Sequence, residues 1–216
     1  WSSDVCSSDL ILILAKLISE LTMKKNIKII GFSLLGIILI FVGKYVYDMN
    51  INHNFETIST GKVYKSGVIP PDEIADYVKE YHIKSIVDLR FPGTGDLVNN
   101  PEIPAELTAE KEAVAKIPGV NYFNNGSDQV PKQENLDSFF KIMDNPDNYP
   151  VLIHCYHGVG RAEMYSAIYR IEYENFTNEQ ARQGVRTMIK WSSFDDGTPK
   201  GEYLKAYKSR KQLGEK

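Results

Sequence analysis

An apolar strand that passes through a short glycine-containing turn directly into a helix constrains the fold of this chain most. Val151–His154 (VLIH) is apolar without alternation up to the histidine, as expected of a short strand buried on both faces. Cys155 follows, then five residues of which two are glycine, and Arg161–Tyr173 is predicted as a helix. Strand, tight loop and helix in this order are typical of α/β layers with a largely parallel sheet.

The remainder of Gly61–Lys216 continues this alternation of strands and helices. We therefore predict an α/β fold, with a central, mostly parallel sheet flanked by helices, as one domain over residues 61–216. The other predicted strands are Lys62–Lys65, Ser85–Leu89 and Val120–Phe123. Five further helices are predicted. The first begins at Pro71, the second covers Ala105–Lys116, and the third carries the apolar stripe Leu136, Phe139, Phe140 and Met143. The fourth begins at the Thr177–Gln180 capping box and carries Ala181, Val185, Met188 and Ile189, and the last covers Glu202–Lys211.

The start of the chain is expected not to belong to the protein. Trp1–Leu10 reads like the translation of a common sequencing-adapter oligonucleotide, and Ile11–Thr22 reads like leader translated in frame, so Met23 is the expected start. Setting residues 1–22 aside removes Cys6 and leaves Cys155 as the single cysteine. One cysteine makes neither an internal disulfide nor a thiolate metal cluster.

An uncharged run, Ile29–Gly43, precedes the predicted domain and extends to Val46 if Lys44 reaches the interface. Its length is near the lower limit for a helix that crosses a bilayer. Three interpretations stay open: a signal anchor, a cleaved signal peptide and a buried core helix. The residues after the run are bulky and offer no small-residue cleavage site, which favours an anchor over residues 23–48, followed by a polar linker over residues 49–60.

Three lysines, Lys24, Lys25 and Lys28, lie before this run. By the positive-inside tendency they keep the N-terminus in the cytoplasm, so we expect the domain to face an extracytoplasmic space. The formal net charge of −3 does not support nucleic-acid binding. The histidines have no zinc-like spacing, and no metal or organic cofactor is expected. The oligomeric state is not predicted.

The loop between Cys155 and Arg161 has the composition of an anion cradle. A loop that leads into a helix N-terminus can point several backbone N–H groups at one anion, and Gly158 and Gly160 allow the backbone conformations that this requires. Arg161 can bind two oxygens of a phosphate, and the same positive field favours the thiolate form of Cys155. His154 is expected to support the loop by hydrogen bonding. The predicted phosphate-binding residues are Tyr156, His157, Gly158, Val159, Gly160 and Arg161. The alternative is a glycine-rich turn with a small buried cysteine.

At His154–Arg161 (HCYHGVGR) the chain resembles the cysteine-dependent protein tyrosine phosphatases, whose signature is H-C-x5-R. The segment Lys62–Arg90 also looks like the opening of the compact dual-specificity and atypical tyrosine phosphatases, and the resemblance covers most of Gly61–Met188. It implies hydrolysis of phosphate monoesters through a phosphocysteine, with a phosphorylated protein or a small phosphomonoester as substrate. Since only His157 could add charge within the loop, protein phosphotyrosine or dual specificity is favoured, and inositol polyphosphates are the alternative.

The resemblance also implies a general acid on a loop before the signature, for which Asp128 in the loop Asn124–Pro131 is the best candidate. A turn-forming role is the alternative for this residue, and Asp96 and Asp137 are the fallback candidates for the acid. Asp88 and Arg90, at the end of a predicted strand, are more readily explained by an ion pair or a loop anchor.

One position departs from the family pattern. Ala162 stands where the family usually has Ser or Thr, whose hydroxyl helps the sulfur leave when the phosphoenzyme is hydrolysed. Two other classes of function therefore stay open: a binding module that captures phosphate without turnover, and a sulfur-transfer enzyme of the rhodanese kind. The arginine at the end of the loop argues against the second.

Overall fold

The computed structural model describes residues 7–91, 103–185 and 192–214. The chain divides into two compact units, Trp1–Tyr47 and Asp48–Lys216. In the described residues the strands are β1 (Glu56–Ser59), β2 (Val63–Ser66), β3 (Ser85–Asp88), β4 (Asn121–Asn124) and β5 (Val151–His154). The α-helices are α1 (Ser7–Asn50), α2 (Ile74–Tyr81), α3 (Pro104–Ala115), α4 (Gln133–Met143), α5 (Arg161–Tyr173), α6 (Asn178–Gly184), α7 (Pro199–Ala206) and α8 (Arg210–Leu213).

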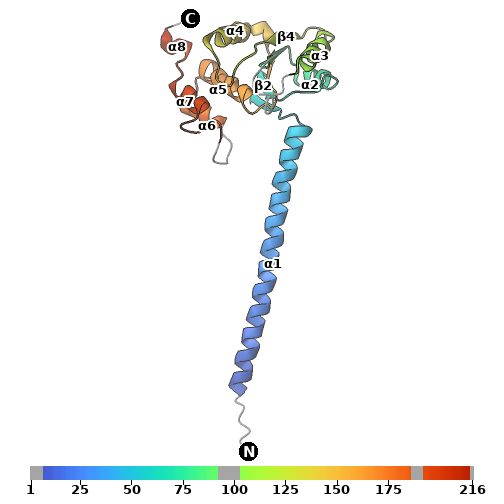
Figure 1. The fold of residues 1–216 in the computed structure, drawn as a ribbon, viewed down its shortest axis with the longest axis vertical. Coiled ribbons are helices and arrows are strands. Elements are labelled where there is room, and N and C mark those ends of the chain that lie inside the picture. Colours follow the sequence, from blue (N-terminus) through green and yellow to red (C-terminus); the bar gives the residue numbers. More distant parts are fainter. Residues whose placement is uncertain (1–6, 92–102, 186–191, 215–216) are drawn as a thin grey trace, which may run out of the picture. The chain divides into compact units, whose positions relative to one another are not determined.

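In the described residues the first unit is the part of α1 up to Tyr47, and this helix runs without interruption to Asn50 (Figure 1). Its part Lys25–Asn50 is long and apolar enough to cross a membrane, and none of the side chains in its most apolar window is buried. The predicted helix over the uncharged run is therefore confirmed. Its exposed apolar side chains are the opposite of what a buried core helix presents.

The second unit is built on a mixed sheet in the order β1-β2-β5-β3-β4, with β5 in the middle. Only β1 is antiparallel to its neighbour, and all other pairs are parallel. Val63 and Ser85 both lie opposite Val151, so the three inner strands end level at the same edge of the sheet. The predicted α/β fold with a mostly parallel central sheet is confirmed, and β5 and α5 have the predicted bounds.

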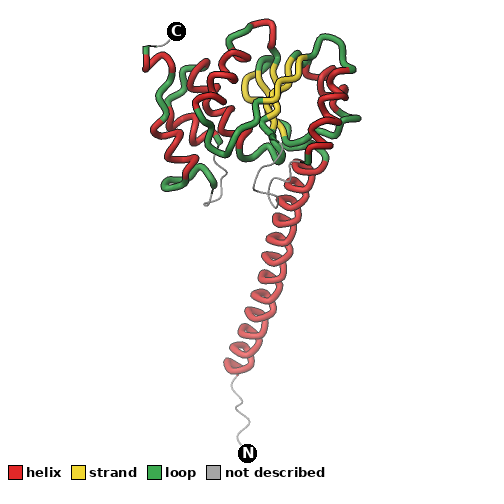
Figure 2. Tube along the Cα trace, turned by 45° about the horizontal axis from the view of Figure 1, so that its top comes forward, coloured by secondary structure: helices red, strands yellow, loops and turns green. Residues whose placement is uncertain are grey.

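Alternate residues of β5 face two different helical layers. Val151 and Ile153 belong to a core cluster with residues of α4, α5, α6 and α7, whereas Leu152 belongs to a cluster with α2 and α3. Figure 2 shows the strands between these two groups of helices. Burying each such aliphatic side chain contributes roughly 1.5–3 kcal/mol, so both helical layers hold β5 and the loop after it in place.

The linker predicted over residues 49–60 is not irregular throughout, because it contains β1. Ile58 of this strand is buried in the core, and Glu56 lies opposite Lys65 in the antiparallel register with β2. The compact unit accordingly begins at Asp48 rather than at Gly61. A single inward-facing isoleucine was too weak a pattern to predict this strand.

The predicted last helix, Glu202–Lys211, is two helices. The side-chain amide of Asn178 donates hydrogen bonds to the carbonyls of Lys205 and Tyr207, which removes them from helical pairing. Ser209 then caps α8 by accepting a hydrogen bond from the backbone N–H of Gln212. Met188 and Ile189, predicted to continue the helix that begins at the Thr177 cap, lie outside the described residues.

Candidate active site

The loop Cys155–Gly160 leaves the sheet at its centre. It connects β5 to α5 and emerges between the ends of β2 and β3. The carboxyl ends of parallel strands are where open α/β sheets bind ligands. The carbonyl of Gly160 accepts the hydrogen bond of the Met164 N–H, so α5 begins directly after the loop. Position and helix dipole both suit an anion here.

The carbonyl groups of the loop are tied to its surroundings. Three in succession accept hydrogen bonds: Tyr156 from the N–H of Val68 (3.0 Å), His157 from Nδ2 of Asn54 (3.1 Å) and Gly158 from Nζ of Lys65 (3.3 Å). A trans peptide unit holds its C=O and the following N–H on opposite sides, and these peptide bonds are trans. The N–H groups of His157, Gly158 and Val159 therefore face the other side of the loop.

The sulfur of Cys155 lies on that inner side. Its Sγ accepts a hydrogen bond from the N–H of Gly158 at 3.3 Å, and the residue is 2 % exposed. The sulfur is thus placed against a backbone N–H donor of the loop that leads into α5. The predicted cysteine and the predicted cradle of amides are thus brought together, and Cys155 is also a member of the main core cluster.

Gly158 is required by both conformation and space. Its φ of +75° lies in the left-handed region, and a Cβ there would come within 2.6 Å of the backbone nitrogen of Gly67 and the carbonyl carbon of Ser66. The loop can therefore pack onto the end of β2 only with glycine at this position.

Arg161 is held at the start of α5 and is 3 % exposed. Its Nη1 donates to the carbonyl oxygens of Leu89 at 2.8 Å and Ser127 at 3.3 Å. These carbonyls come from the segments that follow β3 and β4, so the guanidinium is fixed between two neighbouring strand ends. Such anchoring reduces the conformational entropy that an arginine loses when it binds an oxyanion.

Lys65 is a buried cation that supports the loop, and it is not among the predicted site residues. Its Nζ lies 3.0 Å from carboxylate oxygens of both Glu56 and Glu163, besides donating to the carbonyl of Gly158. Burial alone would lower the pKa of Lys65, but the two carboxylates outweigh it and the pKa is raised. Burial raises the pKa of Glu163, against the effect of the lysine. The signal available in the sequence was a lysine inside a short predicted strand. All residues of this strand are buried in the structure, and a lysine is rarely buried without a partner.

His154 belongs to a buried ion network beneath the loop. Its Nε2 lies 2.8 Å from Glu110 and 3.7 Å from Asp88, while Arg90 donates to both carboxylates and the hydroxyl of Tyr122 donates to Asp88. Burial disfavours charge on His154, yet the two carboxylates raise its pKa. His154 thus lies beside carboxylates of α3 and β3, and its role in supporting the loop stays a prediction. The predicted pairing of Asp88 with Arg90 is present.

Three side chains of this network could in principle hold a metal ion, because Asp88, Glu110 and His154 offer ligand atoms within 4.8 Å of one another. A divalent ion there would have to share them with the guanidinium of Arg90, which is already bonded to both carboxylates. We interpret the group as a charge-balanced ion network, because buried carboxylates are stable when paired in this way.

The predicted acid, Asp128, lies one residue after the carbonyl that Arg161 contacts. Its carboxylate is 55 % exposed and lies 3.5 Å from Nζ of Lys132. Of the fallback candidates, Asp137 accepts a hydrogen bond from Gln133 on the exposed surface of α4, and Asp96 lies outside the described residues. The backbone of Asp128 thus lies next to Arg161, while its side chain is exposed to solvent.

A second lysine that is not among the predicted site residues lies next to the loop. Lys200 in the first turn of α7 donates to Oε1 of Gln129 at 3.1 Å. A Cβ on Gly160 would lie 2.8 Å from that oxygen and 3.4 Å from Nζ of Lys200. No sequence pattern connects a lysine this far along the chain with the signature, so only the tertiary fold reveals it.

The missing hydroxyl at Ala162 has no substitute on the next turn of α5. Ala162 is fully buried, and the hydroxyl of Ser166 donates to its carbonyl at 2.7 Å. That hydroxyl is therefore already committed to the helix backbone, as serines inside helices often are.

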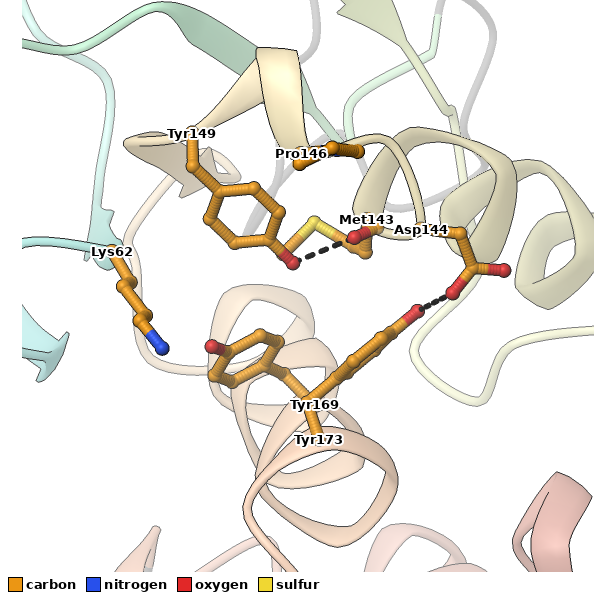
Figure 3. A pocket seen from close by; sticks show the side chains of 7 residues that line it. All are labelled: Lys62, Met143, Asp144, Pro146, Tyr149, Tyr169 and Tyr173. Atoms are coloured by element: carbon orange, nitrogen blue, oxygen red, sulfur yellow. Dashed lines mark hydrogen bonds between the residues drawn. The ribbon is translucent and has the colours of Figure 1, made fainter.

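A separate hollow of about 500 Å³ lies at the opposite end of the parallel strands, where Lys62 precedes β2 and Tyr149 precedes β5 (Figure 3). The hydroxyl of Tyr149 donates to the carbonyl of Met143, and that of Tyr173 donates to Asp144. Polar groups of its walls thus bond to one another, and the hollow is distinct from the loop.

A cysteine held by inward-facing amides at the carboxyl edge of a central strand is what the resemblance to tyrosine phosphatases implied, and the chain is a phosphatase of this cysteine-dependent superfamily. A model of the family described as "DSP-PTPase phosphatase fused to NAD+ Kinase" matches residues 43–198, and the chain belongs to that family. A sequence search of curated proteins gave no significant match.

Several solved structures have a similar fold. The core catalytic domain of the PP-IP phosphatase SIW14 from S. cerevisiae, in complex with citrate, is 20 % identical with a TM-score of 0.54, and the match covers 74 % of this chain and 88 % of that one. TpbA of P. aeruginosa is 15 % identical with a TM-score of 0.53, covering 73 % and 86 %. Tk-PTP is 19 % identical with a TM-score of 0.51, covering 70 % and 91 %. At these identities the likeness concerns the fold.

Proposed function

We propose that this chain hydrolyses phosphate monoesters through a phosphocysteine on Cys155. The observation that carries this proposal is the hydrogen bond from the Gly158 N–H to the sulfur, inside a loop whose carbonyls are turned outward. The amides and Arg161 bind the phosphate oxygens and stabilise them in the transition state.

The reaction proceeds in two steps. The Cys155 thiolate gives an electron pair to phosphorus, the bond to the alcohol or phenol oxygen breaks, and Asp128 gives that oxygen its proton. Water then attacks the phosphocysteine, Asp128 takes a proton from the water, and the sulfur–phosphorus bond breaks. Inorganic phosphate and the thiolate result, and neither step uses a metal or an organic cofactor.

Protein phosphotyrosine or dual specificity is the favoured substrate class, because the loop itself carries no lysine or arginine before Arg161. Inositol polyphosphates are the alternative, which the fold likeness to a PP-IP phosphatase supports. The test is phosphate release by the full chain in detergent from phosphotyrosyl, phosphoseryl and inositol phosphate substrates and from p-nitrophenyl phosphate. Turnover should vanish in Cys155→Ser. Equal turnover in that variant, or cyanide-dependent thiocyanate formation, would refute the mechanism.

A phosphate-binding module without turnover is the second candidate, and the buried Ala162 favours it. The two candidates differ in pre-steady-state kinetics. A phosphatase with a slow second step releases one equivalent of p-nitrophenol in a burst and then turns over, whereas a binding module retains phosphate affinity and releases none. Ala162→Ser should raise the steady rate after the burst.

We also propose that residues 23–48 anchor the chain in a membrane, with the phosphatase domain outside the cytoplasm. The exposed apolar side chains of this helix and the three lysines before its uncharged run support the proposal. Protease added to intact cells whose outer barrier has been opened should digest the domain. Complete protection would rule out this orientation.

A further inference from the structure

The ammonium of Lys200 lies beside the phosphate loop and is only partly covered by protein. Its Nζ donates to Oε1 of Gln129 at 3.1 Å and lies 4.9 Å from the ring centroid of Phe194. It would be 3.4 Å from a Cβ on Gly160, the residue directly before Arg161. An anion held by the start of α5 would therefore have this ammonium as a neighbour.

The two lysines near the loop differ in how their charge is balanced. The ammonium of Lys65 lies 3.0 Å from a carboxylate oxygen of Glu56 and of Glu163, so its charge is balanced by these two groups. Among the described residues, no carboxylate lies within 4.0 Å of Nζ of Lys200, whose neighbours are a neutral amide and an aromatic ring. A half-buried cation with neutral neighbours gains most from an added anion.

The charges farther from Lys200 agree with this assignment. Burial and Arg161 lower the pKa of Lys200, and negative charge on Cys155 and on the more distant Glu163 opposes this effect. The ammonium of Lys200 therefore interacts electrostatically with both Cys155 and Arg161. Gln129 accepts from Lys200 through its oxygen, and its amide nitrogen is a donor of the right kind for the same anion.

We propose that Lys200 and Gln129 form an anion subsite adjoining the phosphate loop, which binds a second phosphate group next to the one that is hydrolysed. This inference rests on the proposed function of the Cys155 loop. Because the loop itself offers no further arginine or lysine, the subsite on α7 and the loop after β4 gives the enzyme affinity for substrates with adjacent phosphates, the alternative substrate class of the proposed function.

Binding of inorganic phosphate and of pyrophosphate tests the subsite, since only pyrophosphate carries the second group. Both ligands are titrated calorimetrically into the full chain in detergent. In Lys200→Met we expect about a tenfold loss of pyrophosphate affinity, about 1.4 kcal/mol, and less than about a twofold change for phosphate. Lys200→Arg should keep the preference. Lys205→Met, which removes a lysine of the same helix paired with Glu202 and Asp196, should change neither affinity.

Equal losses for the two ligands would overturn the subsite, because Lys200 would then serve the phosphate in the loop. Unchanged pyrophosphate affinity would overturn it as well. Near-UV circular dichroism checks that Lys200→Met is folded, and Lys200→Gln, which keeps a hydrogen-bond donor for Gln129, decides the question if it is not. These binding readouts are independent of turnover. A wild type that prefers pyrophosphate but never hydrolyses an ester refutes the proposed function and not the subsite.

A final comparison identifies the source of the second phosphate. Phosphate release is measured from a soluble bisphosphate ester and from vesicles that contain a bisphosphorylated lipid. Release from either that falls about tenfold in Lys200→Met, with unchanged release from p-nitrophenyl phosphate, supports the subsite and assigns its substrate. Equal falls for all substrates would contradict it.

Discussion

Replacing Gly158 by alanine tests the geometry on which the site depends. The residue has a φ of +75°, and the new Cβ would lie 2.6 Å from two backbone atoms at the end of β2 and 2.8 Å from the carbonyl oxygen of Ser66. Neither backbone can move without cost, because the end of β2 is paired with β5 and the loop is fixed to Lys65 and Asn54.

The size of the effect follows from two contributions. An alanine held in the left-handed region costs about 1–2 kcal/mol. Overlap with fixed backbone adds about 1–3 kcal/mol, as overpacking in well-packed cores does. Gly119 separates the two, since its φ of +78° is similar and a Cβ there would meet no atom within 4 Å. Gly119→Ala carries only the first contribution, so we expect Gly158→Ala to be less stable than Gly119→Ala by about 1–3 kcal/mol.

The assay is urea unfolding of the full chain in detergent, followed by near-UV circular dichroism, with p-nitrophenyl phosphate kinetics on the same samples. Displacing the Gly158 N–H removes one donor to the transition state, so kcat/KM should fall by about 100-fold, while Gly119→Ala keeps it within about twofold. Equal stability of the two variants would refute the spatial argument. Unchanged kcat/KM in Gly158→Ala would refute the role of its amide.

Three further perturbations probe the groups around the loop. Lys65→Met should lower the free energy of unfolding by about 3 kcal/mol, because Glu163 then keeps a buried carboxylate without its cation. Asp128→Asn should lower kcat by about 100-fold for phenyl phosphate, whose leaving group is poor, and far less for p-nitrophenyl phosphate. The carboxylates raise the pKa of His154, so its stabilising contribution is complete below the ordinary value of about 6.5 and is lost as pH rises through the raised folded-state pKa. His154→Gln should remove that decline from a urea-unfolding series in pH.

Matched surface variants control these experiments. Lys62→Met removes an exposed lysine next to β2 and should change stability by less than about 0.5 kcal/mol. Asp137→Asn should leave the dependence on the leaving group unchanged, and a matching loss there would move the acid role away from Asp128. His82→Asn alters an exposed histidine and should retain the decline of stability with pH. A flat pH profile in the wild type would contradict the charged network around His154.

The separation of the site residues along the chain explains why some of them can be predicted from the sequence and others cannot. Cys155 and Arg161 are separated by one short loop, so local rules for a strand, a glycine-containing turn and a helix bring them together. Lys65, Glu110 and Lys200 come from other elements. Their meeting with the loop depends on strand order and on which helix packs where, and neither leaves a local pattern.

The sequence by itself determined the buried strand Val151–His154, the helix from Arg161, the short loop between them and the α/β class, because each follows from periodicity and backbone preferences over a few neighbouring residues. Tertiary structure alone decided the rest. It turned the loop carbonyls outward by pairing them with distant donors, made β1 an edge strand, directed the side chain of Asp128 to solvent and brought Lys200 to the loop. Those outcomes rest on contacts between residues far apart in the chain, whose energies no local pattern encodes.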